Sequence, residues 1–500
     1  TIETAEKIGV FATEIRPQNR LCDIRILPGT KQENGLVSGE FGFHTDVFKG
    51  TAHFKLLDGH CLTLGTYAED LVVPLNVAET SNLGSDTIII GAGHAGLSLA
   101  AWLKHLGVKA TIYDTQDRPG DTWRKRYASL KLHDPTSFNH LPFRPFPKSW
   151  PDFAPKDMLA DFLTEYASEL QLDVVPRTRC TSASFSNGAW QVELQSGGKT
   201  RRVTCRNLVL ATGRFAKPVM PEFPGMDCFD GPIHHAADFR DSAAYAGKKV
   251  TVVGAANTAF DISHDLARHG AEVTLLQRSP VSLISQKTFS DMLFAQLPDG
   301  FDGLQQPNAI EREIHAIPAR LYLETAVNFW KSTCETDKDL HARLSKAGLM
   351  LDDGYEGTGV FGQYKLGGTG LVVDQGPGEW IADGRIAVKN GAIGSIEPAG
   401  IRLENGDHIA ADAIICATGY HPVSETLDDL LGVEASSRIG PVWGPGAGGR
   451  HDPGPWTGEH RNVWTPTALQ GLWFHGGSLG ISRFYSHLLA LQIATSVQEM

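Results

Sequence analysis

In this 500-residue chain, three glycines in one short turn are the first residues whose type and spacing indicate a binding function. Residues 91–96 read GAGHAG, so Gly91, Gly93 and Gly96 follow the spacing GxGxxG. In such a turn the first glycine permits a tight bend, and the second lets the backbone approach a pyrophosphate. The third lets a helix pack closely on a strand. The spacing therefore predicts a phosphate-binding turn.

The elements around this turn are those that a dinucleotide-binding unit requires. An apolar, β-branched run precedes the turn at 86–90, a helical pattern follows at 97–106, and a second strand at 109–113 ends at Asp114. N–H groups at the helix start receive phosphate charge, and Asp114 is placed to accept hydrogen bonds from a ribose. The helix start adds the candidate contacts His94 and Ala95.

A second unit of the same kind begins at Gly254 in the segment GAANTA. Ala256 and Ala259 stand where the fingerprint has its second and third glycines, which weakens the motif. Arg278, with Ser279 beside it, takes the place that Asp114 has in the first unit. An acid suits a free ribose 2′-hydroxyl and an arginine suits a 2′-phosphate, so we expect FAD at the first unit and NADPH at the second.

The larger pattern of the chain also occurs twice. Three strands at 182–205 lead into one ATG segment, and a second predicted meander at 386–388, 393–396 and 401–403 leads into another. A chain with two such units most simply binds two dinucleotides. The two ATG segments supply the candidate cofactor contacts Ala211, Thr212, Gly213, Thr418 and Gly419.

Two further stretches are placed to meet a flavin ring. The segment just beyond the second strand supplies the candidates Asp121, Thr122 and Trp123. Near the C-terminus a glycine-rich turn feeds a helix, whose positive dipole end would face the flavin pyrimidine and stabilise the reduced ring. The ordinary docking of a C-terminal helix remains the alternative. This turn supplies the candidates Gly476, Gly477 and Gly480.

Composition excludes several classes of function. The net charge of −12 argues against nucleic acid as a partner. The seven cysteines are scattered with no CxxC pair, which favours a reducing compartment and argues against a redox dithiol. No long apolar run predicts a membrane span, and the start of the chain has no secretion signal. We therefore expect a cytoplasmic protein without a metal site.

We predict an α/β fold with two Rossmann-like units, β-meanders, a helical insert and a small N-terminal β element. The expected FAD-binding domain comprises 81–215 and 421–500, and the NADPH-binding domain comprises 216–420 with the insert at 281–376. Residues 1–80 form a β-rich extension. The insert is predicted to be helical at 289–296, 310–331 and 339–347. Its aromatic residues either line a substrate cavity or form an ordinary core: Phe294, Tyr322, Phe329 and Trp330.

Between the two units, Phe229, Gly231, His235 and Phe239 fit the motif FxGxxxHxxx(F/Y/W). Over roughly 81–500 the chain resembles the class B flavin-dependent monooxygenases, also through RYASLKLHDP, GAANTAFD, CATGY and GLWFHGGSLG. The segment LKLH is most similar to the YUCCA-like members. Phe239, which is not a tryptophan, and Arg240 after it lean away from the Baeyer–Villiger fingerprint.

The resemblance implies an enzyme that uses NADPH and oxygen. NADPH would reduce FAD, and a flavin hydroperoxide would then oxygenate a small organic substrate at a heteroatom or in a YUCCA-like reaction. Baeyer–Villiger insertion next to a carbonyl is the alternative. A flavin reductase or a non-catalytic flavin-binding protein is more remote. The implied partners are a small-molecule substrate and molecular oxygen, with a homodimer as one option.

The resemblance also assigns roles to single residues. It implies that His133 and Asn257 act in catalysis, and that His235, Asn257 and Thr258 contact cofactor. His133 lies where many flavin-containing monooxygenases have an asparagine that contacts flavin and NADP. A histidine there can donate the same hydrogen bond and can also titrate near neutral pH. A structural histidine in a polar loop is the equally weighted alternative.

Overall fold

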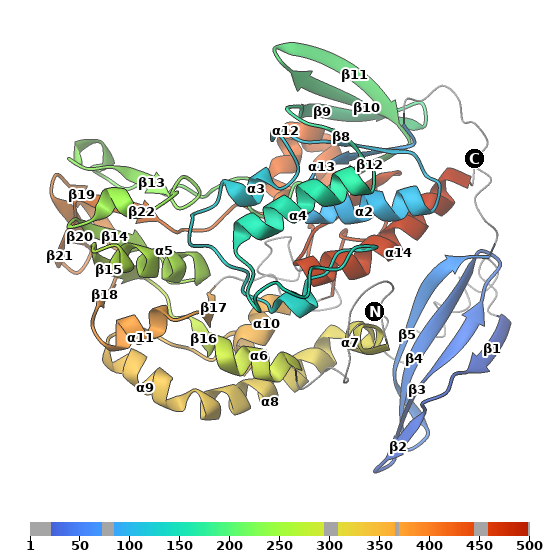
Figure 1. The fold of residues 1–500 in the computed structure, drawn as a ribbon, viewed down its shortest axis with the longest axis horizontal. Coiled ribbons are helices and arrows are strands. Elements are labelled where there is room, and N and C mark those ends of the chain that lie inside the picture. The colour runs from blue at the N-terminus through green and yellow to red at the C-terminus, as the bar shows by residue number, and fades with distance from the viewer. Residues whose placement is uncertain (1–21, 73–84, 295–308, 366–369, 445–458, 499–500) are drawn as a thin grey trace.

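The computed structural model describes residues 22–72, 85–294, 309–365, 370–444 and 459–498. Within these ranges two parallel sheets carry helices on their faces, a helical insert lies beside them, and an antiparallel sheet stands apart near the N-terminus (Figure 1). This arrangement confirms the predicted α/β class. None of the helices within the same ranges is both long and apolar enough to cross a membrane.

The first sheet is wholly parallel, in the order β23-β12-β6-β7-β8. Its strands are β6 (Thr87–Ile90), β7 (Ala110–Tyr113), β8 (Asp173–Val175), β12 (Asn207–Leu210) and β23 (Leu472–Phe474). Its helices are α2 (His94–His105), α4 (Lys156–Glu169) and α14 (Leu479–Gln498). The helices α2 and α14 pack on each other in the core of this unit (Figure 1). The predicted strand–turn–helix–strand unit is thus confirmed.

A three-stranded antiparallel meander and short helices flank the first sheet. The elements are β9 (Arg179–Ser186), β10 (Ala189–Ser196), β11 (Lys199–Cys205), α3 (Asp121–Arg124), α12 (Leu427–Leu431) and α13 (Val433–Ile439). The turn between the first two strands holds Asn187 and Gly188 at φ of +53° and +75°, which are the angles that a two-residue hairpin turn requires. The meander that we predicted at 182–205 is confirmed.

The second sheet is also parallel, in the order β13-β22-β14-β15-β18. Its elements are β13 (Ile233–His235), β14 (Lys249–Val253), β15 (Glu272–Gln277), β18 (Ile386–Asn390) and β22 (Ala413–Cys416), with helices α5 (Asn257–Arg268) and α11 (Pro377–Ala382). The apolar strands β14 and β22 are buried almost throughout, as the central strands of a parallel sheet should be.

One part of the predicted second meander is wrong. The segment at 386–388 does not join an antiparallel meander. As β18 it pairs in parallel with β15, and Ile386, which is buried, lies opposite Val273. The meander instead comprises β19 (Ile393–Glu397), β20 (Gly400–Leu403) and β21 (His408–Ala410). The sequence pattern of a short apolar strand is the same in both settings, so it could not separate them.

The insert is mostly helical, and a short parallel strand pair joins its two ends. The pair is β16 (Ser282–Ser285) with β17 (Leu371–Asp374). The helices are α6 (Gln286–Phe294), α7 (Ala309–Ala316), α8 (Ala319–Thr336), α9 (Lys338–Lys346) and α10 (Gly359–Lys365). The predicted helix at 310–331 is broken into α7 and α8, because Pro318 stands before α8. The end of the predicted helix at 289–296 lies outside the described residues.

The N-terminal strands form one antiparallel sheet that contacts the insert. They are β1 (Cys22–Ile26), β2 (Lys31–Glu33), β3 (Leu36–His44), β4 (Phe48–Leu57) and β5 (His60–Leu71). Arg312 of α7 pairs with Glu40 at 2.8 Å, and its carbonyl accepts from the Tyr67 hydroxyl. The predicted β element is confirmed for 22–72; residues 1–21 and 73–80 of that prediction lie outside the described ranges.

Candidate functional site

The first glycine turn is built so that only glycine fits two of its positions. Gly91 has φ of +113°, and a Cβ there would lie 2.4 Å from the carbonyl oxygen of Ala211. A Cβ on Gly96 would lie 2.0 Å from the carbonyl oxygen of Gly91. A Cβ on Gly93, by contrast, would meet no heavy atom within 4 Å. The turn therefore packs tightly on the protein side and leaves open space at Gly93, where a pyrophosphate would approach.

The backbone N–H groups at the start of α2 have no side-chain cap among the described residues. Gly93 provides no side-chain cap, and the first turn of the helix holds no acidic residue. Asp114 closes the neighbouring strand and accepts from the N–H of Ala92 at 2.6 Å and of Gln116 at 2.7 Å. A carboxylate has about four acceptor sites, so Asp114 can also accept from a ribose. These residues fit the phosphates and ribose of FAD.

The C-terminal turn lies against the first glycine turn. The Nε2 atom of His94 donates to the carbonyl oxygen of Gly477 at 3.0 Å, and the rings of His94 and Trp123 are 6.3 Å apart. Burial lowers the pKa of His94, so this histidine acts as a neutral donor at pH 7. No heavy atom lies within 4 Å of a Cβ built on Gly476, whereas one on Gly480 would meet the carbonyl oxygen of Phe138 at 3.2 Å. The predicted cofactor residues His94, Trp123 and Gly477 thus lie close together.

The segment after β7 is held by ion pairs. Asp121 is buried, and one of its oxygens lies 2.9 Å from both Arg118 Nε and Arg124 Nη1. Burial alone would raise the pKa of Asp121, but the two guanidinium groups outweigh it and the pKa is lowered. Its carboxylate is thus engaged by the protein, and Thr122 beside it is exposed. Their contact with cofactor stays a prediction.

The second glycine turn repeats the geometry of the first. Gly254 has φ of +122°, and a Cβ there would lie 2.6 Å from the carbonyl oxygen of Ala417. Ala256 precedes α5 and Ala259 is fully buried in it, so the pattern's third position tolerates a methyl group here. The helix start again has no side-chain cap and no acidic residue. This turn fits a second dinucleotide.

The predicted NADPH contacts of the second unit lie at the end of β15 and at the start of α5. Arg278 and Ser279 are exposed at the end of β15, and Arg278 makes no ion pair with the residues that the structure describes. An exposed guanidinium at this position is accessible to a 2′-phosphate. The side-chain oxygen of Asn257 accepts from the N–H of Val373 at 2.8 Å, so its amide holds strand β17 of the insert. The catalytic role of Asn257 stays a prediction, as does the contact of Thr258.

His235 links the FxGxxxH motif to the second ATG segment. Its Nδ1 accepts from the N–H of Ala237 at 3.0 Å, so Nε2 carries the proton and donates to the carbonyl oxygen of Gly419 at 3.0 Å. Burial lowers the pKa of His235, in agreement with a neutral ring. The Thr418 hydroxyl donates to the carbonyl oxygen of Val219 at 2.6 Å. The motif histidine His235 thus fixes the backbone of the second ATG segment at Gly419.

His133 lies at the junction of the two units. Its Nε2 is 3.3 Å from Oδ2 of Asp261 on α5, at ion-pair distance but without good hydrogen-bond geometry. The Tyr127 hydroxyl donates to the same oxygen at 2.7 Å. Burial disfavours the charged imidazole, yet the attraction of Asp261 outweighs it and the pKa of His133 is raised. The sequence analysis did not predict the roles of Tyr127 and Asp261. The position of Asp261, one helical turn after Asn257 on the same face of the helix, could have indicated its role.

The insert also reaches the first unit. The Tyr364 hydroxyl donates to Ser478 Oγ at 3.0 Å, next to Gly477 in the C-terminal turn. Lys365 Nζ lies 5.5 Å from the ring centroid of Tyr322. These contacts were also missed, because the sequence pattern of an insert does not show where it folds back.

Of the four insert aromatics predicted as cavity or core, one is shown to be core, and the role of the others stays a prediction. Trp330 is buried and donates to Asp353 Oδ1 at 2.9 Å, so it belongs to the core of the insert. Phe329 is 38% exposed, and Tyr322 contacts Lys365. The side chain of Phe294 lies outside the described residues.

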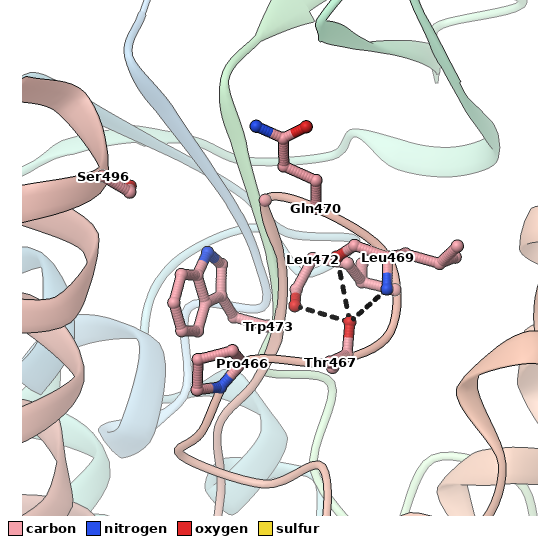
Figure 2. A pocket seen from close by; sticks show the side chains of 8 residues that line it. Pro466, Thr467, Leu469, Gln470, Leu472, Trp473 and Ser496 are labelled. Atoms are coloured by element: carbon pink, nitrogen blue, oxygen red, sulfur yellow. Dashed lines mark hydrogen bonds between the residues drawn. The ribbon is translucent and has the colours of Figure 1, made fainter. Parts of the chain in front are cut away.

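A small surface pocket, of about 300 Å³, lies elsewhere (Figure 2). Its lining includes Thr467, whose hydroxyl donates to the carbonyl oxygen of Leu472, and Trp473 (Figure 2). It sits at the amino end of β23, whereas ligands of a doubly wound sheet bind at the carboxyl ends of the strands. It is therefore separate from the cofactor site.

The cysteines contain no dithiol. All seven are free, and burial raises the pKa of the Cys205 thiol to about 12 and that of Cys416 to about 11. Such thiols are poor nucleophiles. That this chain does not work through a cysteine pair stays a prediction.

A family model and a curated relative both match this chain. Residues 88–318 match the family of pyridine nucleotide-disulphide oxidoreductases. The chain is 33% identical over 348 residues to an indole-3-pyruvate monooxygenase, YUCCA1, of Oryza sativa subsp. japonica, covering 67% of this chain and 76% of that protein.

Two solved structures share the fold. One is OTEMO in complex with FAD and NADP, with a TM-score of 0.58, 17% identity and coverage of 83% of this chain and 85% of that one. The other is a flavin-containing monooxygenase from Stenotrophomonas maltophilia, with a TM-score of 0.54, 20% identity and coverage of 82% and 98%. Together with the two glycine turns and the motif at His235, the similarity to YUCCA1 shows that the chain belongs to the class B flavin-dependent monooxygenases, in agreement with the predicted cofactors FAD and NADPH.

Proposed function

We propose that this monooxygenase acts on a small aromatic substrate that carries a carboxylate, with an indole-type 2-oxo acid as the leading candidate. The observation that carries the proposal is the position of Lys365. Its ammonium group lies over the ring of Tyr322, and its neighbour Tyr364 contacts Ser478 beside the C-terminal turn. The relative named above acts, by its name, on indole-3-pyruvate.

The surroundings of Lys365 favour an anion. Burial lowers the pKa of Lys365, and the charge of Glu459 only partly offsets this effect. Lys365 makes no ion pair with the described part of the chain, and the carboxylate of Glu459 already accepts from the N–H of Ala319 at 2.7 Å. A desolvated cation without a paired acid gains most from an anionic ligand. Aromatic rings beside it suit an aromatic substrate body.

We infer that these side chains border a space that a substrate can enter. Tyr364 is 40% exposed, yet burial raises its pKa, and burial raises the pKa of Tyr322 to about 12. Free surface together with strong desolvation is expected at an internal hollow rather than on the outer face. We infer that the substrate lies between α8, α10 and the C-terminal turn.

The chain's own residues would divide the work as follows. When bound, FAD and NADPH supply hydride transfer and oxygen activation. The start of α2 binds phosphates, Asp114 accepts from ribose, and Arg278 pairs with the 2′-phosphate. His133 holds a proton at Nε2 beside the flavin, and the insert excludes water through the contact of Tyr364 with Ser478.

The test is NADPH-dependent oxygen uptake with matched substrates. We expect product with indole-3-pyruvate, and a rise of its KM by roughly tenfold to a hundredfold in Lys365→Gln, since one charge-assisted contact is lost. An indole ketone without carboxylate should be unaffected by this change. Lys331→Gln, an exposed lysine on α8, is the control.

Two outcomes would count against the proposal. If no compound in a panel of acids, amines, sulfides and ketones yields oxygenated product, monooxygenation of a small molecule by this chain is refuted. If Lys365→Gln leaves the KM of the acid unchanged, the carboxylate assignment is wrong. Conversion of a cyclic ketone to a lactone would establish the Baeyer–Villiger alternative.

A further inference from the structure

One carboxylate oxygen joins the two dinucleotide units at the candidate catalytic histidine. Oδ2 of Asp261 accepts from the Tyr127 hydroxyl at 2.7 Å and lies 3.3 Å from Nε2 of His133. Tyr127 and His133 belong to the loop after α3 in the first unit, whereas Asp261 belongs to α5 of the second. The histidine expected at the flavin is therefore held from the helix whose start is expected to bind NADPH.

We propose that Asp261 is a positioning residue that holds His133 in a fixed orientation at the edge of the flavin site. This inference rests on the proposed function, because it supposes that flavin and nucleotide meet at this junction. Asp261 touches neither the substrate nor the reacting atoms in this proposal. It acts through His133 alone.

The neighbours of the pair leave it little freedom. Tyr127 is 1% exposed, so its ring cannot reorient, and its hydroxyl fixes the carboxylate that His133 faces. On the other side, Gln375 donates from Nε2 to the carbonyl oxygen of Leu132 at 2.8 Å, which fixes the backbone next to His133. A carboxylate that is largely withdrawn from water is stable only when paired in this way.

The remaining charges around the pair act in both directions. Asp134 follows His133, and its own pKa is raised by burial, while Arg126 opposes a second positive charge. On the adjoining strand Asp374 has its pKa raised by burial to about 6 and repels Asp261. The sum still raises the pKa of His133 above its ordinary 6.5, with Asp261 as the largest favourable contribution.

The rival explanation is a contact that only joins the two units. Removing it would then weaken folding without changing the protonation of His133 or the fate of reduced flavin. The chain offers a matched control one helical turn away: Asp265 is also a buried carboxylate of α5, which accepts from the Ser242 hydroxyl at 2.6 Å and lies 3.5 Å from His269. Asp265→Asn should cost stability alone.

The experiment measures the titration of His133 by NMR on the FAD-loaded protein with ¹³C-labelled histidine, using His133→Gln to assign the signal. In the unchanged chain we expect titration above pH 6.5. In Asp261→Asn the midpoint should fall, in Asp261→Glu it should be retained, and in Asp265→Asn it should not move. In parallel, peroxide released per NADPH oxidised should rise roughly tenfold in Asp261→Asn, with its pH profile displaced to lower pH.

The outcomes separate this inference from the proposed function. A midpoint below 6.5 in the unchanged chain overturns the inference without any variant, so it remains testable if Asp261→Asn does not fold. Equal effects of Asp261→Asn and Asp265→Asn on peroxide release also overturn it. If NADPH is not oxidised at all, the proposed function fails while the titration result still decides the role of Asp261.

Discussion

Gly93→Ala is expected to abolish FAD binding while leaving the protein folded. Gly93 has φ of −75° and ψ of 179°, which any residue adopts, and its Cβ would meet no atom of the chain within 4 Å. The change in the free energy of unfolding without FAD should therefore stay within about 1 kcal/mol. The added methyl group instead occupies the space that the pyrophosphate needs.

Gly96→Ala provides the contrasting perturbation in the same turn. Its Cβ would lie 2.0 Å from the carbonyl oxygen of Gly91, and because that oxygen is backbone, it cannot swing away. Forced overpacking of this kind costs about 1–3 kcal/mol or more, whether or not FAD is present. The two variants thus separate a ligand effect from a folding effect.

The assay is denaturant unfolding with and without FAD, together with the flavin absorbance of the reconstituted protein. FAD at a hundred times its Kd should stabilise the unchanged chain by about 2.7 kcal/mol. Gly93→Ala should lose this increment and stay colourless. A yellow Gly93→Ala protein with the full increment would show that the pyrophosphate does not lie at this turn.

Two further changes test the second unit and the buried histidines. Arg278→Ala should raise the KM for NADPH by about tenfold to a hundredfold and leave that for NADH almost unchanged; an equal loss for both nucleotides would argue against a 2′-phosphate contact. His475 is buried, and burial lowers its pKa to about 3. Because the unfolded chain binds this proton first, stability should fall as the pH drops from 6.5 towards 3, with a slope of about 1.4 kcal/mol per pH unit from this group. His475→Gln should remove that part of the slope in denaturant unfolding at pH 7 and pH 5; an unchanged slope would place the proton uptake elsewhere.

The first unit could be predicted from sequence because its signals are local. A β-branched run, three glycines and an acid occupy fewer than thirty consecutive residues, and each acts on its own backbone or its neighbour's. The junction at Asp261 could not be predicted in the same way. Tyr127 and Asp261 are 134 residues apart in the chain, and only the packing of α5 on the loop after α3 brings them together.

The errors also have physical reasons. The strand β18 has the length and composition of a meander strand, and its parallel partner β15 is more than a hundred residues away in sequence. Trp330 could equally be core or cavity, because an aromatic residue on a helix buries its face in either case. Its hydrogen bond to Asp353, inside the same insert, shows that Trp330 belongs to the core of the insert.

The two glycine turns each make the same kind of contact with an ATG segment, but only the second turn also contacts the insert. Gly91 lies against Ala211 as Gly254 lies against Ala417, so each ATG segment closes its own dinucleotide turn. Only the second turn also carries the insert, whose strand β17 is held by Asn257 and whose Gln375 and Tyr364 reach back to the first unit. Cofactor binding is therefore specified by short, repeated motifs that any member of the fold can carry. Under the proposed function, the long-range contacts of the insert would set substrate choice, so substitutions at Lys365 and Tyr364 should change specificity before they change flavin reduction.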